Sequence, residues 1–444
     1  MLETSLTQWS NESWPSHTTI GVHMARRVVI TGIGTVAPGD PGVESFWNLI
    51  SSGTTATRRI TQFDPEAYRS QIAAECNFSG TALGLSSRQV RQLDRATQFA
   101  LVAAREAIGN SGIDLHRIPP YRIGVAFGSA VGCTTAMERE YAVLSNDGQD
   151  WLVDSDFAVN ELYDHFVPSS IAAELARDIQ AEGPVALISD GCTSGLDAIG
   201  YASDLIREGT ADVVLSGGTD APISPITLAC FDAIKATSPR NDDPETASRP
   251  FDSSRNGLVL GEGAAALVLE ELEHARARNA PILAEVAGFG SRSNAFHMTG
   301  LRADGAEMAY AIDEALGEAR LDASELHYIN AHGSSTKQND RHETAAFKRS
   351  LGRWAYKTPV SSIKSMIGHS LGAIGALEIA ACALAMQHDV IPPTANLHDA
   401  DPLCDLDYVP LVARETTVDA VLSVGSGFGG FQSAVVLARH DRRN

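Results

Sequence analysis

Four side chains suited to nucleophilic catalysis each follow a short strand-like run. Cys192 comes directly before a helical pattern, His332 follows YINA, and Lys364 and His369 lie five residues apart after VSSI. At a helix N-terminus the free N–H groups and the dipole favour an anion, so we expect a lowered pKa for the Cys192 thiol. A lone cysteine of this kind could instead be a buried structural residue. Because strand ends converge on one crevice in open α/β sheets, we expect the four side chains to form a single site.

The elements that must position these residues are buried strands and amphipathic helices in alternation. Runs rich in Val and Ile alternate with helical patterns, which is typical of an α/β protein. Three of these runs, 28–34, 213–219 and 421–430, resemble one another and weakly indicate an internal duplication. A further strand is expected at 185–189, buried on both faces. Helices are expected at about 91–110, 168–178, 193–208, 304–319, 337–350 and 371–387. The irregular segment 235–257 is a long loop, and long loops inside compact domains are usually functional.

Composition excludes several classes of protein. The 444 residues include 34 basic and 55 acidic side chains, a net charge of −21, and 44% of them are hydrophobic. Without a run of Lys or Arg, such a chain is not expected to bind nucleic acid. Six isolated cysteines with no CxxC pair argue against a disulfide framework and a zinc ribbon, and favour the cytoplasm. No stretch is uncharged and apolar enough for a membrane span.

The chain is expected to divide into three parts. Residues 1–23 contain neither the basic residues nor the apolar stretch of a targeting peptide, and we interpret them as a loosely packed polar tail. Two intimately packed halves should follow, at 24–280 and 281–444, because no low-complexity linker divides the chain.

Four motifs resemble other kinds of site, and the sequence around each of them disfavours that interpretation. The glycine patterns at 32–37 and 425–430 follow strands but lack the helix that a dinucleotide site needs. The His and acidic residues at 332–343 do not have the spacing of a metal site. The GxSxG match at 368–372 resembles a hydrolase elbow, which makes Ser370 an alternative acyltransferase nucleophile. Met366 and Ile367 intervene between it and the preceding strand, which counts against that alternative.

Taken together, the segments DGCTSGLDA, NAHGSSTKQND, SIKSMIGHSLGA and GSGFGG resemble the β-ketoacyl synthase family of the thiolase fold. The resemblance runs from about residue 26 to 438. It is nearest to the ketosynthase alpha subunit of bacterial type II polyketide synthases, through DAPISPITLACFDAIKATSPRND and NDRHETAAFKRSLG. The resemblance implies an α/β fold in which two similar α/β halves pack in layers (αβαβα).

The activity implied is a decarboxylative Claisen condensation between acyl groups on acyl carrier protein. By resemblance, Cys192 accepts the growing chain, and the backbone N–H groups of Cys192 and Phe428 form the oxyanion hole. Loss of CO2 leaves negative charge on the thioester oxygen, so His332 and His369 are expected to be neutral donors there. Lys364 adds a positive field, and we expect Glu343 to be its partner. The resemblance thus implies six catalytic residues: Cys192, His332, His369, Lys364, Glu343 and Phe428.

The resemblance also implies contacts with the carrier protein. Ser334 and Thr336 occupy hydroxyl positions for hydrogen bonds to the pantetheine arm, and Phe428 could gate the acyl pocket. Arg88, Arg91 and Arg240 match docking positions, although each could be an ordinary solvated charge.

No bound cofactor or metal is expected, because the carrier delivers its own phosphopantetheine, and the expected partner subunit is a chain length factor. The alternative pathway is fatty-acid elongation by a homodimer of β-ketoacyl synthases. A scaffold or priming partner without chemistry is disfavoured, because the chain keeps Cys192, His332, Lys364 and His369 together.

Overall fold

Ten strands form the framework, and they divide into two halves of five. The computed structural model describes residues 26–150 and 155–441, so the expected tail at 1–23 lies outside the described residues. The strand order is β11-β10-β14-β15-β9-β1-β8-β6-β4-β5. Their bounds are β1 Val28–Val36, β4 Ile123–Gly128, β5 Val185–Ile188, β6 Val213–Asp220, β8 Gly263–Glu271, β9 Ala284–Ser293, β10 Tyr328–Asn330, β11 Val360–Ser361, β14 Ala420–Ser426 and β15 Phe431–Ala438.

The two halves have the same strand pairing. In the first, β1-β8 and β8-β6 are antiparallel, and β6-β4 and β4-β5 are parallel. In the second, β9-β15 and β15-β14 are antiparallel, and β14-β10 and β10-β11 are parallel. Only Val29 with Glu285 and Ile30 with Ala284 pair across the junction of β1 and β9. The runs at 213–219 and 421–430 thus occupy equivalent strands, β6 and β14, whereas 28–34 is equivalent to β9.

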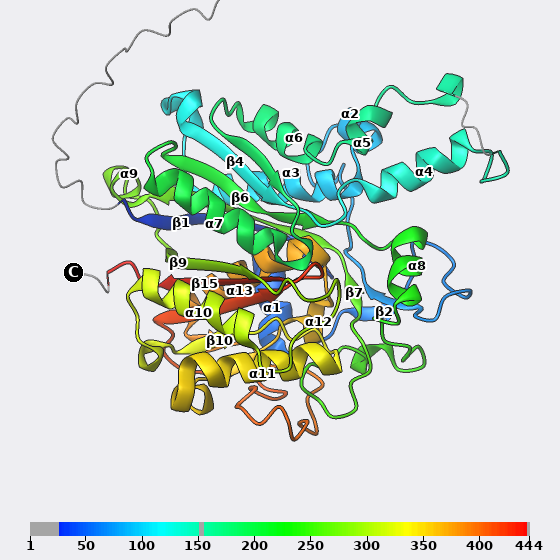
Figure 1. Ribbon diagram of the computed structural model, residues 1–444. Coiled ribbons are helices and arrows are strands. Elements are labelled where there is room, and N and C mark those ends of the chain that lie inside the picture. Colours follow the sequence, from blue (N-terminus) through cyan, green and yellow to red (C-terminus); the bar gives the residue numbers. More distant parts are fainter. Residues whose placement is uncertain (1–25, 151–154, 442–444) are drawn as a thin grey trace, which may run out of the picture.

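Helices form three layers around the two halves (Figure 1). Helices α3 (Arg95–Ser111) and α6 (Ser170–Ile179) cover the outer face of the first half, and α10 (Ala306–Ala319) and α11 (Lys337–Leu351) cover the second. Between the halves lie α7 (Ser194–Arg207) and α13 (Ile374–His388), which pack on each other and on both sets of strands. This arrangement confirms the αβαβα expectation.

The central helix α13 is apolar on all sides because both of its faces meet strands. In the described part of the chain, the segment Leu371–His388 is the one helix long and apolar enough to cross a membrane, but 89% of it is buried within the protein. We therefore interpret it as a core helix.

Two sequence expectations need correction. The helix expected at 91–110 is two helices, α2 (Ser87–Gln92) and α3, because the Asp94 side chain accepts the N–H of Ala96 and caps a new start. The strand expected to be buried at 185–189 is β5, an edge strand whose Val185 is 43% exposed, since β5 pairs only with β4.

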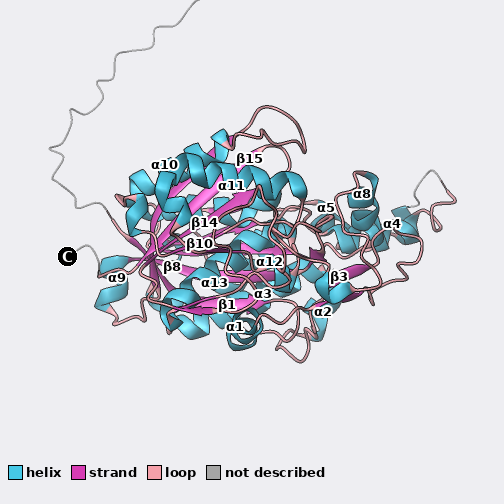
Figure 2. Ribbon diagram, turned by 90° about the horizontal axis from the view of Figure 1, so that it is seen from below, coloured by secondary structure: helices cyan, strands magenta, loops and turns pink. Residues whose placement is uncertain are grey.

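The remaining elements are shorter and lie largely in the connections. Helices α4 (Thr134–Leu144), α5 (Leu162–Phe166) and α8 (Pro225–Ala233) lie at the end of the molecule opposite α9 (Leu272–Ala277) in both views (Figures 1 and 2). The loop 235–257 contains only one short turn of 3-10 helix, Pro244–Thr246. The bounds of the others are α1 Val43–Ser52, α12 Lys364–Ile367, β2 Thr57–Arg59, β3 Ile72–Ala74, β7 Leu260–Gly261, β12 Val390–Ile391 and β13 Arg414–Glu415.

Candidate active site

Cys192 lies in the turn between β5 and α7, as expected. Gly191 has φ +60°, a left-handed conformation that glycine adopts without strain, and a 3-10 turn covers Gly191–Thr193. The Ser194 hydroxyl accepts the N–H of Asp190 at 2.9 Å and donates to the carbonyl of Gly191 at 2.6 Å. These bonds fix the turn, and the Cys192 side chain is buried at 8% exposure.

The glycine loop after β14 packs directly on this turn. A Cβ atom added to Gly427 would lie 3.2 Å from the Cys192 nitrogen, and one added to Gly191 would lie 3.0 Å from the Phe428 carbonyl oxygen. The backbone N–H of Phe428 donates to the Cys192 thiol group. The Phe428 ring stacks on Phe231 with centroids 6.2 Å apart. Phe428 therefore contacts both the thiol, through its backbone, and the cavity wall, through its ring.

The pKa of the Cys192 thiol is raised, whereas the sequence predicted that it would be lowered. Burial raises the pKa of the thiol from 9.0 to about 12, while the Lys364 charge and the Phe428 N–H oppose the rise. The prediction of a lowered pKa was wrong, because it considered only the helix N-terminus and not the loss of solvent around the sulfur. At neutral pH the resting thiol is protonated, so deprotonation must accompany attack on the substrate.

This pKa predicts how Cys192 alkylation depends on pH. At pH 8 its thiolate fraction is about 10³-fold smaller than that of a thiol with a pKa of 9.0, so reaction with iodoacetamide should be slow. The rate should rise about tenfold per pH unit through pH 10 without a plateau. Peptide-resolved mass spectrometry would measure it, with the exposed Cys230 of the same chain as control. A plateau below pH 9 would contradict the protonated resting thiol.

His332 and His369 lie together beside the cysteine. Their rings have centroids 5.2 Å apart and are nearly perpendicular, at 80°. Burial and the nearby Lys364 charge lower the pKa of both imidazoles well below 6.5, so both rings are neutral at pH 7. The N–H of Leu371 donates to Nδ1 of His369 at 3.2 Å, which places the proton of the neutral ring on Nε2. His369 can therefore donate from Nε2.

Lys364 does not pair with Glu343, contrary to our expectation. Its ammonium group forms a fully buried ion pair with Glu378 of α13. Glu343 instead accepts the backbone N–H groups of His332 and Gly333 and so anchors the histidine loop. Burial raises the pKa of Glu343 to about 8 and that of Glu378 to about 7. The sequence did carry a signal for Glu378: it is the only charged residue in α13, and a charge there must be paired.

One cavity of about 510 Å³ brings most of the candidate residues together. The members of the expected site that line it are Cys192, His332, His369, Ser334, Thr336 and Phe428. Lys364 and Glu343 lie behind this lining, at 1% and 0% exposure. Ser370 is buried, belongs to the turn before α13 and does not line the cavity, so the geometry gives no support to a Ser370 nucleophile.

The three arginines considered for docking lie outside the cavity lining. Arg88 and Arg91 belong to the exposed helix α2, where Arg88 donates to Gln92 at 2.6 Å. Arg240 lies in the 235–257 loop, 3.9 Å from Asp243. The structure does not bring these three side chains into the cavity.

Comparison with known proteins places the chain among condensing enzymes. Residues 25–275 match the family model described as the N-terminal domain of β-ketoacyl synthase, and residues 283–398 match its C-terminal domain. The chain is 66% identical to the tetracenomycin polyketide synthase ketoacyl synthase alpha subunit of Streptomyces glaucescens, over 94% of this chain and 98% of that protein. It is 62% identical to the oxytetracycline polyketide putative β-ketoacyl synthase 1 of Streptomyces rimosus, over 95% and 99% of the two chains.

Identity to a synthase outside the polyketide group is lower. The chain is 40% identical to 3-oxoacyl-[acyl-carrier-protein] synthase 2 of Coxiella burnetii (strain RSA 493 / Nine Mile phase I), over 93% of this chain and 99% of that protein.

Solved structures resemble the chain over the same range. One is a type II polyketide synthase acyl-carrier protein in complex with its ketosynthase bound to the hexaketide, with TM-score 0.88 and 38% identity over 94% of this chain and 100% of that chain. Another is the ishigamide ketosynthase/chain length factor, with TM-score 0.85 and 32% identity over 94% and 100% of the two chains.

Proposed function

This chain belongs to the β-ketoacyl synthase family, and from that premise we propose how its site works as the ketosynthase alpha subunit of a type II polyketide synthase. The enzyme is an acyltransferase that joins malonyl units to an acyl chain by decarboxylative Claisen condensation. One observation carries the assignment of the site: Cys192, whose thiol accepts the backbone N–H of Phe428, lines the same cavity as two neutral histidines.

The first step transfers the acyl chain to Cys192. Its sulfur attacks the thioester carbonyl of the carrier-bound acyl group, and the backbone N–H groups of Cys192 and Phe428 stabilise the oxyanion of the tetrahedral intermediate. The intermediate collapses with cleavage of the bond to the carrier's sulfur, which takes up the proton that Cys192 loses. Because the resting thiol is protonated, the Lys364 charge matters most as negative charge develops on the Cys192 sulfur.

The second step forms the new carbon–carbon bond. Cleavage of the malonyl carboxylate releases CO2 and leaves an enolate on the carrier-bound thioester. His332 and His369 donate to its oxygen, and their lowered pKa keeps them neutral through this step. The enolate carbon then attacks the Cys192 thioester, and the thiolate leaves and is reprotonated. The Lys364–Glu378 pair lies behind the cavity lining and supplies a fixed field.

Alanine at either histidine should separate the two steps. In His332→Ala and His369→Ala, Cys192 should still take up an acyl group, while decarboxylation of malonyl-carrier protein falls about 10²–10³-fold because one donor to the enolate is lost. Intact-mass measurement of the acyl-enzyme and the rate of CO2 release would check this. Equal loss of both steps in both variants would contradict the assigned role.

The carrier protein is the macromolecular substrate. We propose that Ser334 and Thr336, whose hydroxyls lie 3.1 Å apart in the cavity wall, receive the pantetheine arm. The arm arrives with the carrier, so the reaction needs no resident cofactor. We propose that the exposed Arg88 and Arg91 and the half-buried Arg240 dock the acidic carrier.

The docking proposal has a direct test. Reversing all three charges should raise KM for carrier-bound substrate about tenfold without changing kcat, because long-range attraction acts on encounter. KM unchanged in the triple variant would remove these arginines from the docking site.

The second protein partner is a chain length factor subunit. The open edge of β5, with Val185 exposed, leaves unpaired backbone groups that a partner's strand could cover, and we propose this edge as part of the interface. A homodimeric fatty-acid synthase fits less well, because identity is 62–66% to the two polyketide relatives and 40% to the 3-oxoacyl synthase. We also propose a cytoplasmic site of action, since the six cysteines are all free thiols.

Reconstitution tests the pathway. The purified chain should condense malonyl units on carrier protein with a chain length factor subunit and should do so poorly without one. A fully active homodimer in the absence of any partner subunit would favour fatty-acid elongation instead.

A further inference from the structure

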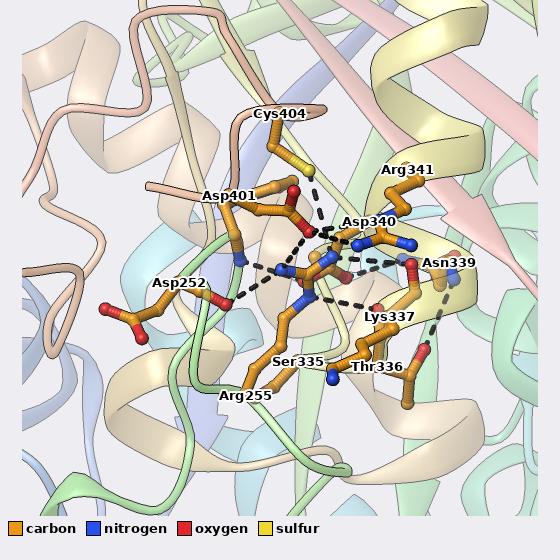
Figure 3. A network of polar contacts seen from close by, with 12 residues as sticks. Asp252, Arg255, Ser335, Thr336, Lys337, Asn339, Asp340, Arg341, Asp401 and Cys404 are labelled. Carbon is orange, nitrogen blue, oxygen red and sulfur yellow. Dashed lines mark hydrogen bonds and ion pairs between the residues drawn. The ribbon is translucent and has the colours of Figure 1, made fainter. Parts of the chain in front are cut away.

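Arg255 is a fully buried guanidinium that the condensation mechanism does not use. It lies in the 235–257 loop and has no exposed surface. Its Nε group lies 2.9 Å from a carboxylate oxygen of Asp340, and its Nη1 group lies 3.0 Å from a carboxylate oxygen of Asp401. Both acids are also buried, at 0% and 4% exposure. Figure 3 shows the guanidinium between the two carboxylates.

The same guanidinium also donates to backbone carbonyls. Nη1 donates to the carbonyl of Asp252 at 2.8 Å, Nε to that of Thr336 at 3.3 Å and Nη2 to that of Lys337 at 3.4 Å (Figure 3). A single planar fork thereby joins the 252–255 turn to the N-terminus of α11. Ion pairs in the protein interior recover little net stability after desolvation, so the value of this one is better sought in geometry.

The two segments that Arg255 joins are both walls of the active-site cavity. Asn256, Gly257 and Leu258 directly follow it in the chain and line the cavity. Residues 336–339 line the cavity as well, and Arg255 donates to the carbonyls of the first two, Thr336 and Lys337. The same side chain therefore fixes the distance between one lining segment, through its own backbone, and another, through its donors.

Strained backbone in these segments makes such fixing necessary. Ser335 has φ +66°, a conformation that costs a non-glycine residue about 1–3 kcal/mol and persists only where its surroundings enforce it. The Ser335 carbonyl accepts the N–H of Gly257 at 3.3 Å, and its hydroxyl accepts the N–H of Arg249 at 3.0 Å. Thr336, next to this strained residue, turns its hydroxyl toward Ser334 and caps α11. The Ser334–Thr336 hydroxyl pair thus depends on contacts that cross between the two walls.

We propose that Arg255 is a positioning residue for the thioester arm of the carrier-bound substrate, acting through the Ser334–Thr336 hydroxyl pair and the Asn256–Leu258 wall. The inference rests on the proposed function, which supplies the arm. The reacting groups are held by other contacts: Glu343 anchors His332, and Ser194 fixes the turn of Cys192. Loss of Arg255 should therefore affect arm binding more than the chemical steps.

The test is a KM-against-kcat split in the complete enzyme with its partner subunit. Arg255→Lys keeps the charge but offers donors from one atom, which cannot reach both carboxylates and both carbonyls of α11. We expect KM for malonyl-carrier protein and for malonyl-pantetheine to rise about tenfold or more, with kcat within about threefold of wild type. KM for a truncated malonyl-N-acetylcysteamine thioester, which lacks most of the arm, should not change, and neither should Cys192 alkylation.

A matched control removes a neighbouring charge without removing the fork. Arg341 also contacts Asp401 at 3.0 Å, but its side chain is 45% exposed. Arg341→Met should therefore leave both KM and kcat near their wild-type values. If Arg255 variants do not fold, Asp401→Asn weakens one ion pair and keeps the guanidinium, and a KM rise of about threefold is expected from it.

Several results would overturn the inference. Wild-type KM values in Arg255→Lys would show that only the positive charge matters. An equal rise in KM for the long and the truncated thioesters would show a purely structural role. An unchanged KM in Asp401→Asn, where Arg255 variants fail to fold, would count equally against it. Wild-type enzyme that condenses no malonyl unit would refute the proposed function itself, whereas an active wild type with an unaffected Arg255→Lys variant refutes only this inference.

Discussion

Cys192→Ala should abolish condensation, with turnover reduced about 10³-fold or more. The alanine has no atom that can hold the acyl chain, so the carbon–carbon bond has no acyl donor within the cavity. The methyl side chain fits where the thiol was, and Ser194 still fixes the turn, so the fold should be kept. Product release from carrier protein, followed by mass spectrometry, would measure the loss.

The same variant should retain part of the chemistry. His332 and His369 lie together on the cavity wall and need no acyl-cysteine to donate to an enolate oxygen. Decarboxylation of malonyl-carrier protein should therefore continue in Cys192→Ala, uncoupled from condensation. Wild-type condensation rates in Cys192→Ala would show that another residue, Ser370 first among them, is the nucleophile.

Glu378→Leu should be the most destabilising single change in the site. It leaves the Lys364 ammonium buried in the core without its ion-pair partner, and removal of one member of such a pair costs about 3–5 kcal/mol. The double variant Lys364→Met/Glu378→Leu removes both charges and fills the space with apolar atoms. Its stability should return to within about 1 kcal/mol of wild type.

Urea unfolding of the two variants beside wild type would check both values. The double variant also separates stability from activity, because it should fold well and yet condense slowly without the Lys364 charge near Cys192. If the free energy of unfolding of Glu378→Leu equalled that of wild type, Glu378 would not be the partner that stabilises the buried Lys364. Leu377→Ala, a core truncation in the same helix, is the control for a simple packing loss.

Much of the fold could be predicted from periodicity. The helices expected at 193–208, 304–319 and 337–350 lie within a few residues of α7, α10 and α11, because apolar residues recur in them at helical spacing. The failures have local causes. The break before α3 depended on one capping aspartate, Asp94, and the exposure of β5 depended on its place at the sheet edge, which no residue pattern encodes.

The site was predictable as a set of residues and less so as a set of interactions. Cys192, His332 and His369 each follow a strand, as expected, and the loops that carry them line one cavity. The strands themselves do not adjoin, because β5 lies at one edge of the strand order and β10 and β11 lie at the other. The predicted partner of Lys364, Glu343, was wrong. The true partner, Glu378, lies in the helix between the two halves, and only the tertiary structure brings it to Lys364. The pKa of Cys192 was wrong because desolvation depends on the whole fold. Arg255 was missed, and its only signal was its place in a long loop.

The most direct test of the account is the intact mass of the enzyme after incubation with acyl-carrier protein, alone and with a chain length factor subunit. We predict one acyl adduct on the wild-type chain, which peptide mapping places on Cys192 and which is absent from Cys192→Ala. We also predict that formation of the adduct or its extension depends on the partner subunit. An adduct that persists in Cys192→Ala, or no adduct in any mixture, would contradict the assignment of Cys192 as the acyl carrier of this ketosynthase.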